Sequence, residues 1–256
     1  MVQNYTVWVE KKAYPVVVSD EREALLAAKA AGRVFVALYT ENPEQETIWD
    51  AEYLASPKAI CPEYLERIVR RHIGLPWIIA ETDRLLIREF TSDDIVQMPE
   101  EPDVWYTEEE RAADRVFYDN EKLEAYIKSQ YRFYEYGIWA VVRKADNVIV
   151  GKAGVTNLEE SGDGAAENKT MLITESEHET MPPEESTEYV ELGYHIFRPF
   201  RRQGYAEEAC RSILNYAKEE LSSPVCARVA KENTASIQLL EKLGVPYFII
   251  NPKRNV

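Results

Sequence analysis

The stretch that decides the fold lies at residues 194–206 and reads YHIFRPFRRQGYA. Its first residues are apolar enough for a strand, its middle is a turn rich in arginine, and a helix is expected directly after the glycine. The first turn of a helix has amide N–H groups without internal partners, and the helix dipole makes that end positive. Gly204 and Ala206 leave room for a ligand, while Arg201 and Arg202 add positive charge. The stretch therefore predicts a turn that binds phosphate groups.

Two common nucleotide-binding turns are excluded at this position. A P-loop ends in Gly-Lys followed by Ser or Thr, and this turn does not. A Rossmann turn needs G-x-G-x-x-G and a ribose-binding acid further on, and both are missing.

The chain around this turn alternates between strands and helices. We expect strands at 82–90, 138–143, 148–156, 188–197 and 225–230, helices at 120–136, 204–221 and 233–243, and a last apolar stretch at 247–250. The break Gly74-Leu75-Pro76 precedes all of them. We therefore predict two domains, at residues 1–79 and 80–256.

Residues 1–79 have the pattern of a small α/β unit. The expected order is a strand at 14–19, a helix at 21–31, strands at 33–39 and 54–60, and a helix from Pro62. Strands joined through a helix by short connections favour a parallel sheet. Residues 16–20 and 27–32 resemble the last part of a HAD-type phosphatase. The D-x-D pair of that family occurs nowhere in the chain, so we expect a Rossmann-like unit without catalysis.

The charge of the chain excludes several kinds of partner. Its 256 residues carry 30 basic and 45 acidic side chains, for a net charge of −15. Such a chain is a poor match for nucleic acid or an anionic membrane surface. No apolar run approaches the roughly 20 residues that span a bilayer, and no secretory signal opens the sequence. The three cysteines are scattered without C-x-x-C spacing, so we expect no metal site and a cytoplasmic protein.

Residues 159–188 differ from the rest of the chain. They hold ten acidic residues and one lysine, which is −9 of the total charge. One interpretation is a solvated insertion between two strands. The other is an acidic lip that attracts a cationic substrate.

Four motifs resemble the GNAT N-acetyltransferases, in the order that the family has them. Arg201-x-x-Gly204-x-Ala206 resembles the R/Q-x-x-G-x-G/A signature for acetyl-CoA. Residues 82–88 (TDRLLIR) and 191–194 (ELGY) resemble two strands of the branch that includes the ribosomal-protein acetylases, and residues 231–236 with 241–244 resemble its fourth helix. The resemblance implies an α/β (α+β) fold whose mixed, mostly antiparallel sheet is flanked by helices, and acetyl-CoA as co-substrate.

The resemblance also assigns the residues that bind CoA. The diphosphate would lie on the turn, and the pantetheine amides would pair with the end of the strand before it. The neighbouring helix would contact the same arm through Asn233 and Ser236, although Asn233 could equally be the N-cap of that helix. The expected cofactor-binding residues are Ile196, Phe197, Arg198, Arg201, Arg202, Gln203, Gly204, Tyr205, Ala206, Asn233 and Ser236.

Catalysis is less clearly marked. An amine must be neutral to attack a thioester, so a nearby base is useful. Glu191 is the first candidate, with a solvent-facing or salt-bridged glutamate as the alternative, and His195 is the reserve base. The chain departs from the family twice, because Leu240 replaces a common tyrosine acid and only twelve residues follow Gly244, too few for the family's final hairpin.

The sequence thus predicts an enzyme that moves the acetyl group of acetyl-CoA to a primary, cationic amine by direct attack in a ternary complex. The acceptor would be a small molecule or a protein amine, and the enzyme a monomer or homodimer. The alternative is a CoA-binding sensor or scaffold without catalysis, which the missing tyrosine and the added N-terminal unit motivate.

Overall fold

The computed structural model describes residues 1–39, 51–99, 101, 112, 114–158 and 189–250. The chain divides into two compact units, Met1–Trp77 and Ile78–Val256. None of the described helices is long and apolar enough to cross a membrane. The acidic segment 159–188 falls outside the described residues.

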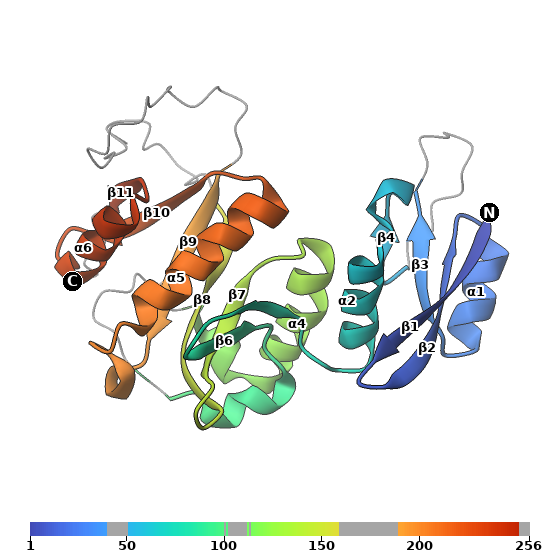
Figure 1. The fold of residues 1–256 in the computed structure, drawn as a ribbon, viewed down its shortest axis with the longest axis horizontal. Helices are drawn as coiled ribbons and strands as arrows, with labels where there is room; N and C mark the ends of the chain where they lie inside the picture. Colours follow the sequence, from blue (N-terminus) through green and yellow to red (C-terminus); the bar gives the residue numbers. More distant parts are fainter. Residues whose placement is uncertain (40–50, 100, 102–111, 113, 159–188, 251–256) are drawn as a thin grey trace. The chain divides into compact units, whose positions relative to one another are not determined.

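The N-terminal unit is a four-stranded sheet with a helix on each face (Figure 1). Its elements are β1 (Val2–Val9), β2 (Lys12–Ser19), α1 (Arg22–Ala30), β3 (Val34–Leu38), β4 (Leu54–Ala55), a 3-10 turn (Pro57–Ala59) and α2 (Pro62–His72). Side chains of a strand alternate between the two faces. Val16, Val18 and Val36 accordingly pack with α2, whereas Val17 and Phe35 pack with α1.

The strand β1 corrects the expectation of a purely parallel sheet. β2, β3 and β4 are parallel as predicted, but β1 pairs antiparallel with β2. The two strands are joined by a tight turn in which Glu10 and Lys11 have φ of 47° and 67°. Such turns usually carry Asn-Gly or Asp-Gly, and Glu-Lys gives no such signal in the sequence. The expected strand at 54–60 is also shorter, because the chain turns at Pro57.

The C-terminal unit is a seven-stranded sheet in the order β11-β10-β9-β8-β7-β6-β5. Its strands are β5 (Ile78–Glu81), β6 (Leu85–Arg88), β7 (Ile138–Arg143), β8 (Val148–Asn157), β9 (Val190–Ile196), β10 (Val225–Ala230) and β11 (Tyr247–Ile250). The pairs from β5 to β9 are antiparallel, whereas β10 is parallel to both β9 and β11. The mixed, mostly antiparallel sheet is confirmed. At the edge where the resemblance implies a final two-stranded hairpin, the described residues form the single parallel strand β11.

Helices cover both faces of this sheet (Figure 1). They are α4 (Asn120–Phe133), α5 (Tyr205–Tyr216) and α6 (Thr234–Leu243), with 3-10 turns at Ser92–Gln97, Arg115–Tyr118 and Arg198–Phe200. Ala209, Cys210 and Ile213 of α5 pack on one face, and Phe117 with Leu123 pack on the other. The helix expected at 204–221 stops at Tyr216, and a π-helical turn continues to Leu221.

Two glycines that face each other on β8 and β9 provide a test of this packing. A Cβ atom at Gly154 would collide with the carbonyl oxygen of Gly137 and lie 2.7 Å from Cα of Ile138. A Cβ atom at Gly193 would meet only the flexible tip of Ile138, at 3.3 Å. We therefore expect Gly154→Ala to lower the free energy of unfolding by about 1–3 kcal/mol and Gly193→Ala by clearly less. Urea unfolding of the two variants measures this, and equal midpoints would contradict it.

Candidate functional site

The candidate site lies where the neighbouring strands β9 and β10 separate. The two strands pair only at Val190 with Val225 and at Glu191 with Cys226. The N–H of Val190 on β9 donates to the carbonyl oxygen of Pro224, which directly precedes β10. The N–H of Phe197, just after β9, donates to the carbonyl oxygen of Val150 on β8. Because peptide groups alternate along a strand, those of residues 192, 194 and 196 point toward the gap. β9 therefore presents a strand edge that β10 leaves uncovered.

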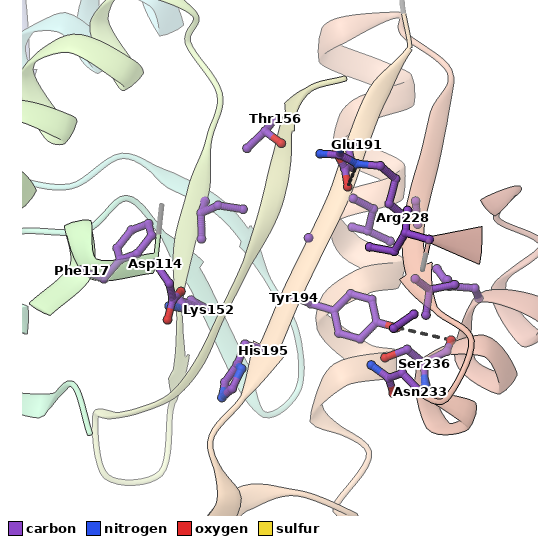
Figure 2. Close-up of a pocket in the computed structure, with 18 of the residues that line it drawn as sticks. Asp114, Phe117, Lys152, Thr156, Glu191, Tyr194, His195, Arg228, Asn233 and Ser236 are labelled. Carbon is purple, nitrogen blue, oxygen red and sulfur yellow. Dashed lines mark hydrogen bonds and ion pairs between the residues drawn. The ribbon is translucent and has the colours of Figure 1, made fainter. Parts of the chain in front are cut away.

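Two cavities meet at this gap, and Tyr194, His195, Asn233 and Ser236 line both. The first, here called the turn pocket, has a volume of about 510 Å³ and extends along the turn 201–206. The second, the sheet pocket, has a volume of about 350 Å³ and extends over β8 and β9 to Asp114 on one side and Arg228 on the other (Figure 2). A ligand can thus run from the turn, through the gap, to the sheet pocket.

The turn has the properties of an anion site. Arg202 and Gly204 adopt left-handed φ of 61° and 82°, and Gly204 is the N-cap of α5. A glycine has no side chain to cap a helix, and no side chain bonds to this helix start. The first amides of α5 and the dipole of the helix are therefore offered to a ligand. Arg201 is oriented beside them by a bond of 2.8 Å from its Nε to the carbonyl oxygen of Ile196.

The start of α6 closes the gap on its other side. The side chain of Asn233 accepts a hydrogen bond of 3.2 Å from the N–H of Ser236, so Asn233 is an N-cap. The hydroxyl of Tyr194 donates to the carbonyl oxygen of Ser236 at 3.4 Å (Figure 2). Burial raises the pKa of Tyr194 to about 12. Tyr194 is therefore an uncharged phenol where the two pockets meet.

Most residues expected to bind the cofactor lie together. The turn pocket is lined by Ile196, Arg201, Arg202, Gly204, Tyr205, Ala206, Asn233 and Ser236. Three others are engaged elsewhere. Phe197 is fully buried with its N–H bonded to β8, the N–H of Arg198 donates to Glu101 at 2.6 Å, and the carbonyl oxygen of Gln203 accepts from Arg84 at 2.9 Å.

The candidate base Glu191 forms an ion pair. Nε of Arg228 lies 2.9 Å from each of its carboxylate oxygens, and Nη2 lies 2.7 Å from Oε2 (Figure 2). Arg228 comes from β10, next to the point where the two strands separate. The salt-bridged alternative for Glu191 is therefore present in the structure, and the carboxylate lines the sheet pocket.

The other candidate, His195, lies at the junction of the two pockets with 9% of its side chain exposed. Its Nε2 is 3.1 Å from Oε2 of Glu101 and 3.4 Å from Nη2 of Arg201. Burial lowers the pKa of His195, and the charges of Lys152 and Arg201 lower it further, while Glu101 opposes them. The imidazole is therefore neutral at neutral pH.

The sheet pocket also contains a buried cation that sequence reasoning missed. Lys152 forms an ion pair with Asp114, and its Nζ lies 4.7 Å from the ring centre of Phe117 and 5.2 Å from that of Tyr118. Burial lowers the pKa of Lys152, although Asp114 acts against this. In the register of β8 against β9, Lys152 lies opposite His195, and Thr156 lies opposite Glu191. Glu101, Asp114 and Lys152 belong to no sequence motif. Only the register of β8 against β9 could have indicated that Lys152 lies beside His195.

Comparison with known proteins agrees with this architecture. Residues 84–246, well over half of the chain, match the family described as acetyltransferase (GNAT) domain. The chain belongs to the GNAT acetyltransferase family. The family uses acetyl-CoA as co-substrate, and the uncapped helix start with its arginines fits the diphosphate of that molecule.

Three of the proteins similar to this GNAT chain show how far the similarity extends. The uncharacterized N-acetyltransferase YjdG of Bacillus subtilis is 38% identical over 65 residues, which cover 25% of this chain and 37% of the relative. A putative GNAT-family acetyltransferase from Bordetella pertussis is 16% identical, with a TM-score of 0.42, over 64% of this chain and 86% of that one. A ribosomal-protein-S5-alanine acetyltransferase from Vibrio fischeri is 14% identical, with a TM-score of 0.43, over 66% and 82%.

The turn pocket predicts the effect of a charge at Gly204. A side chain added at Gly204 would start 3.3 Å from Nη2 of Arg84. A carboxylate there would compete for this guanidinium, disturb the turn and oppose the charge of the diphosphate, so Gly204→Glu is expected to abolish CoA binding. The control is Gly204→Ala, which carries the same backbone strain at a φ of 82° and the same Cβ atom without the charge. Isothermal titration with CoA should show weakened binding to the alanine variant and none to the glutamate variant. Wild-type affinity in the glutamate variant would contradict the assignment of the turn.

Proposed function

We propose that this chain transfers the acetyl group of acetyl-CoA to a primary amine, by direct attack in a ternary complex. The observation that carries the proposal is the separation of β9 from β10 beside the uncapped start of α5. It connects an anion site to a second pocket through one gap, so that one ligand can enter from each side.

The geometry suggests which groups hold the two ends of the CoA arm. The diphosphate would lie against the first turn of α5 and Arg201, and Asn233 and Ser236 would border the arm where it passes α6. The pantetheine amides would pair with the peptide groups of residues 192 and 194, since these point into the gap. The carbonyl oxygen of Ile196 also faces the gap but already accepts from Arg201. This moves the expected pairing from residues 196–198 toward the middle of β9, because the N–H groups of Phe197 and Arg198 already have partners.

We propose His195 as the base that takes the proton of the amine, with Glu191 as the second candidate. His195 borders both pockets, so it lies where the acetyl group and the amine would meet. Its lowered pKa keeps it uncharged. Nε2 faces the carboxylate of Glu101 and therefore carries the proton of the neutral ring, so the proton of the amine would go to Nδ1. Glu191 is held by three contacts of 2.7–2.9 Å to one guanidinium, and this limits its freedom to move toward the amine.

The acceptor is proposed to be cationic in its free form, whether a small molecule or a protein amine. The net charge of −15 attracts cations to the chain, and the segment 159–188 contributes −9 of it in sequence. Inside the sheet pocket, however, the charges are balanced, because Asp114 is paired with Lys152 and Glu191 with Arg228. Attraction of the acceptor would therefore act at long range, outside the pocket.

The direct test is release of CoA from acetyl-CoA across a panel of amines, with product identified by mass spectrometry and Gly204→Glu as the inactive control. An acetylated amine formed only by the wild-type protein would support the proposal. Tight CoA binding without transfer to any amine would instead support a CoA-binding sensor.

The two candidate bases can be told apart by pH. The pKa of His195 lies below its ordinary value of about 6.5. We therefore expect kcat/KM to decrease on the acid side with a midpoint below that pH. His195→Gln is expected to lower kcat by about 10²–10⁴-fold and to remove this decrease. Glu191→Gln should lower kcat less, and neither variant should change the affinity for CoA by a comparable factor. If Glu191→Gln gives the large loss, above all at low pH, the base is Glu191.

The long-range attraction predicts a salt effect on the acceptor. Replacing residues 160–186 by a short Gly-Ser bridge should raise the KM of a polyamine acceptor such as spermidine and flatten its dependence on ionic strength. The KM of acetyl-CoA should stay unchanged. A variant of full length with the acids of this segment changed to amides serves as the control for length. Equal KM values at low salt in all three proteins would show that the segment is a solvated insertion.

A further inference from the structure

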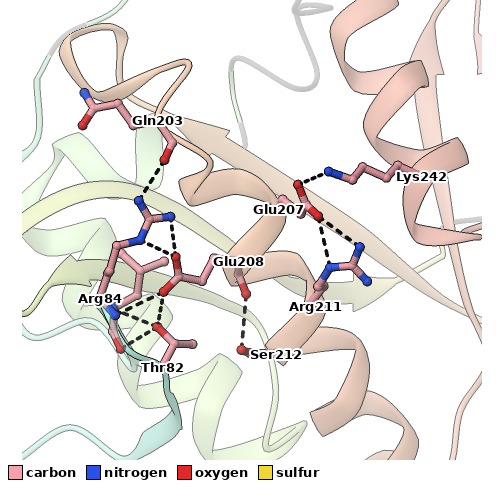
Figure 3. A network of polar contacts seen from close by, with 9 residues as sticks. Thr82, Arg84, Gln203, Glu207, Glu208, Arg211, Ser212 and Lys242 are labelled. Carbon is pink, nitrogen blue, oxygen red and sulfur yellow. Dashed lines mark hydrogen bonds and ion pairs between the residues drawn. The ribbon is translucent and has the colours of Figure 1, made fainter.

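The back of the turn is held by Arg84, which lies between β5 and β6 (Figure 3). Its Nη1 donates to the carbonyl oxygen of Gln203 at 2.9 Å, and its guanidinium carbon lies 4.7 Å from the ring centre of Tyr205. Its Nη2 is also the nearest atom to a Cβ built on Gly204, at 3.3 Å. One guanidinium therefore contacts Gln203 and Tyr205 on either side of Gly204, although 119 positions separate it in sequence from Gln203.

Arg84 is itself fixed by an acid of the first turn of α5. The carboxylate of Glu208 accepts from Nε of Arg84 at 2.7 Å, from its backbone N–H at 3.2 Å, and from the hydroxyl of Thr82 at 2.6 Å (Figure 3). Burial opposes the ionisation of Glu208, but the bonds from Thr82 and Arg84 more than offset it, so its pKa is lowered. The pair is charged at neutral pH and links the β5–β6 turn to the start of α5.

The bond to Gln203 decides which way one peptide group of the turn points. In a trans peptide the C=O and the following N–H point in opposite directions. With the carbonyl oxygen of Gln203 turned to Arg84, the N–H of Gly204 points away from Arg84. Gly204 has a φ of 82° and, as glycine, little steric barrier to a rotation of this peptide. Such a rotation would turn a carbonyl oxygen, with its partial negative charge, away from Arg84 and toward the ligand.

We propose that Arg84 is a positioning residue for the diphosphate of CoA, acting by holding the peptide between Gln203 and Gly204 with its N–H toward the ligand. Glu208 and Thr82 keep the guanidinium in place for this. The proposal rests on the proposed function, since it takes the ligand of the turn pocket to be CoA. It assigns a binding role to the Thr82-Asp83-Arg84 segment, which otherwise only precedes a strand.

The test compares Arg84→Met with Arg211→Met. Arg211 lies further along α5, is similarly exposed (53% against 48% for Arg84) and also pairs with a glutamate, Glu207. Each variant loses one positive charge, so a general loss of attraction for anions affects both equally. Arg84→Met is expected to raise the dissociation constant of CoA about ten- to hundredfold, the range for a hydrogen bond from a charged group, and Arg211→Met to leave it unchanged.

Two readouts separate positioning from damage to the fold. The kcat of Arg84→Met at saturating acetyl-CoA should equal that of the wild type, whereas its KM for acetyl-CoA rises. Its KM for S-acetylpantetheine, which lacks the diphosphate, should not change. Arg84→Lys keeps the charge but cannot hold Gln203 and Glu208 with one planar group, so it should show a smaller rise in the CoA dissociation constant. It serves as the second variant if Arg84→Met does not fold.

Two results would overturn the inference while leaving the proposed function intact. One is an equal CoA affinity in Arg84→Met and Arg211→Met, and the other is an equal rise in KM for acetyl-CoA and S-acetylpantetheine. Absence of CoA binding in the wild-type protein would instead overturn the proposed function itself.

Discussion

In the C-terminal unit the neighbouring strands β9 and β10 pair at one end only, so most of the β9 edge is not covered by a strand. Buried or half-buried peptide groups need hydrogen bonds, so the uncovered edge of β9 favours a ligand that carries amides of its own. The two pockets meet where β9 and β10 separate. Tyr194, His195 and the start of α6 line both pockets at this point. The start of α5 then supplies what such a ligand needs at its charged end.

The turn before α5 depends on groups behind it as much as on groups facing the ligand. Arg201 is oriented by the end of β9, while Gln203 and Tyr205 are held by Arg84 from the other side. Left-handed backbone at a residue other than glycine, here Arg202, costs free energy and persists only where its surroundings determine it. Contacts on both sides of the turn provide such surroundings, and a turn held in this way loses less entropy when a ligand binds.

The sheet pocket combines charges in pairs rather than as a field of one sign. Lys152 with Asp114 and Arg228 with Glu191 lie on opposite sides of the pocket, and Gly193 lines the pocket between them without a side chain. The same buried Lys152 that completes one pair also lowers the pKa of His195 on the neighbouring strand. The register of β8 against β9 therefore contributes to the electrostatics of this pocket.

The sequence by itself determined the family, the turn 201–206 and the order of most helices and strands. These are local properties, because glycine at a helix start, arginines beside it and apolar periodicity are readable within a few residues. The same holds for Asn233 as an N-cap. It could not determine that β1 pairs antiparallel, since Glu10-Lys11 lacks a turn signature. Only the tertiary structure decided that Arg84 lies behind Gln203, that Glu101 lies beside His195 and that Lys152 lies opposite His195. Hydrogen bonds and ion pairs between distant segments depend on how the strands align. Nothing in the spacing of the sequence records that alignment.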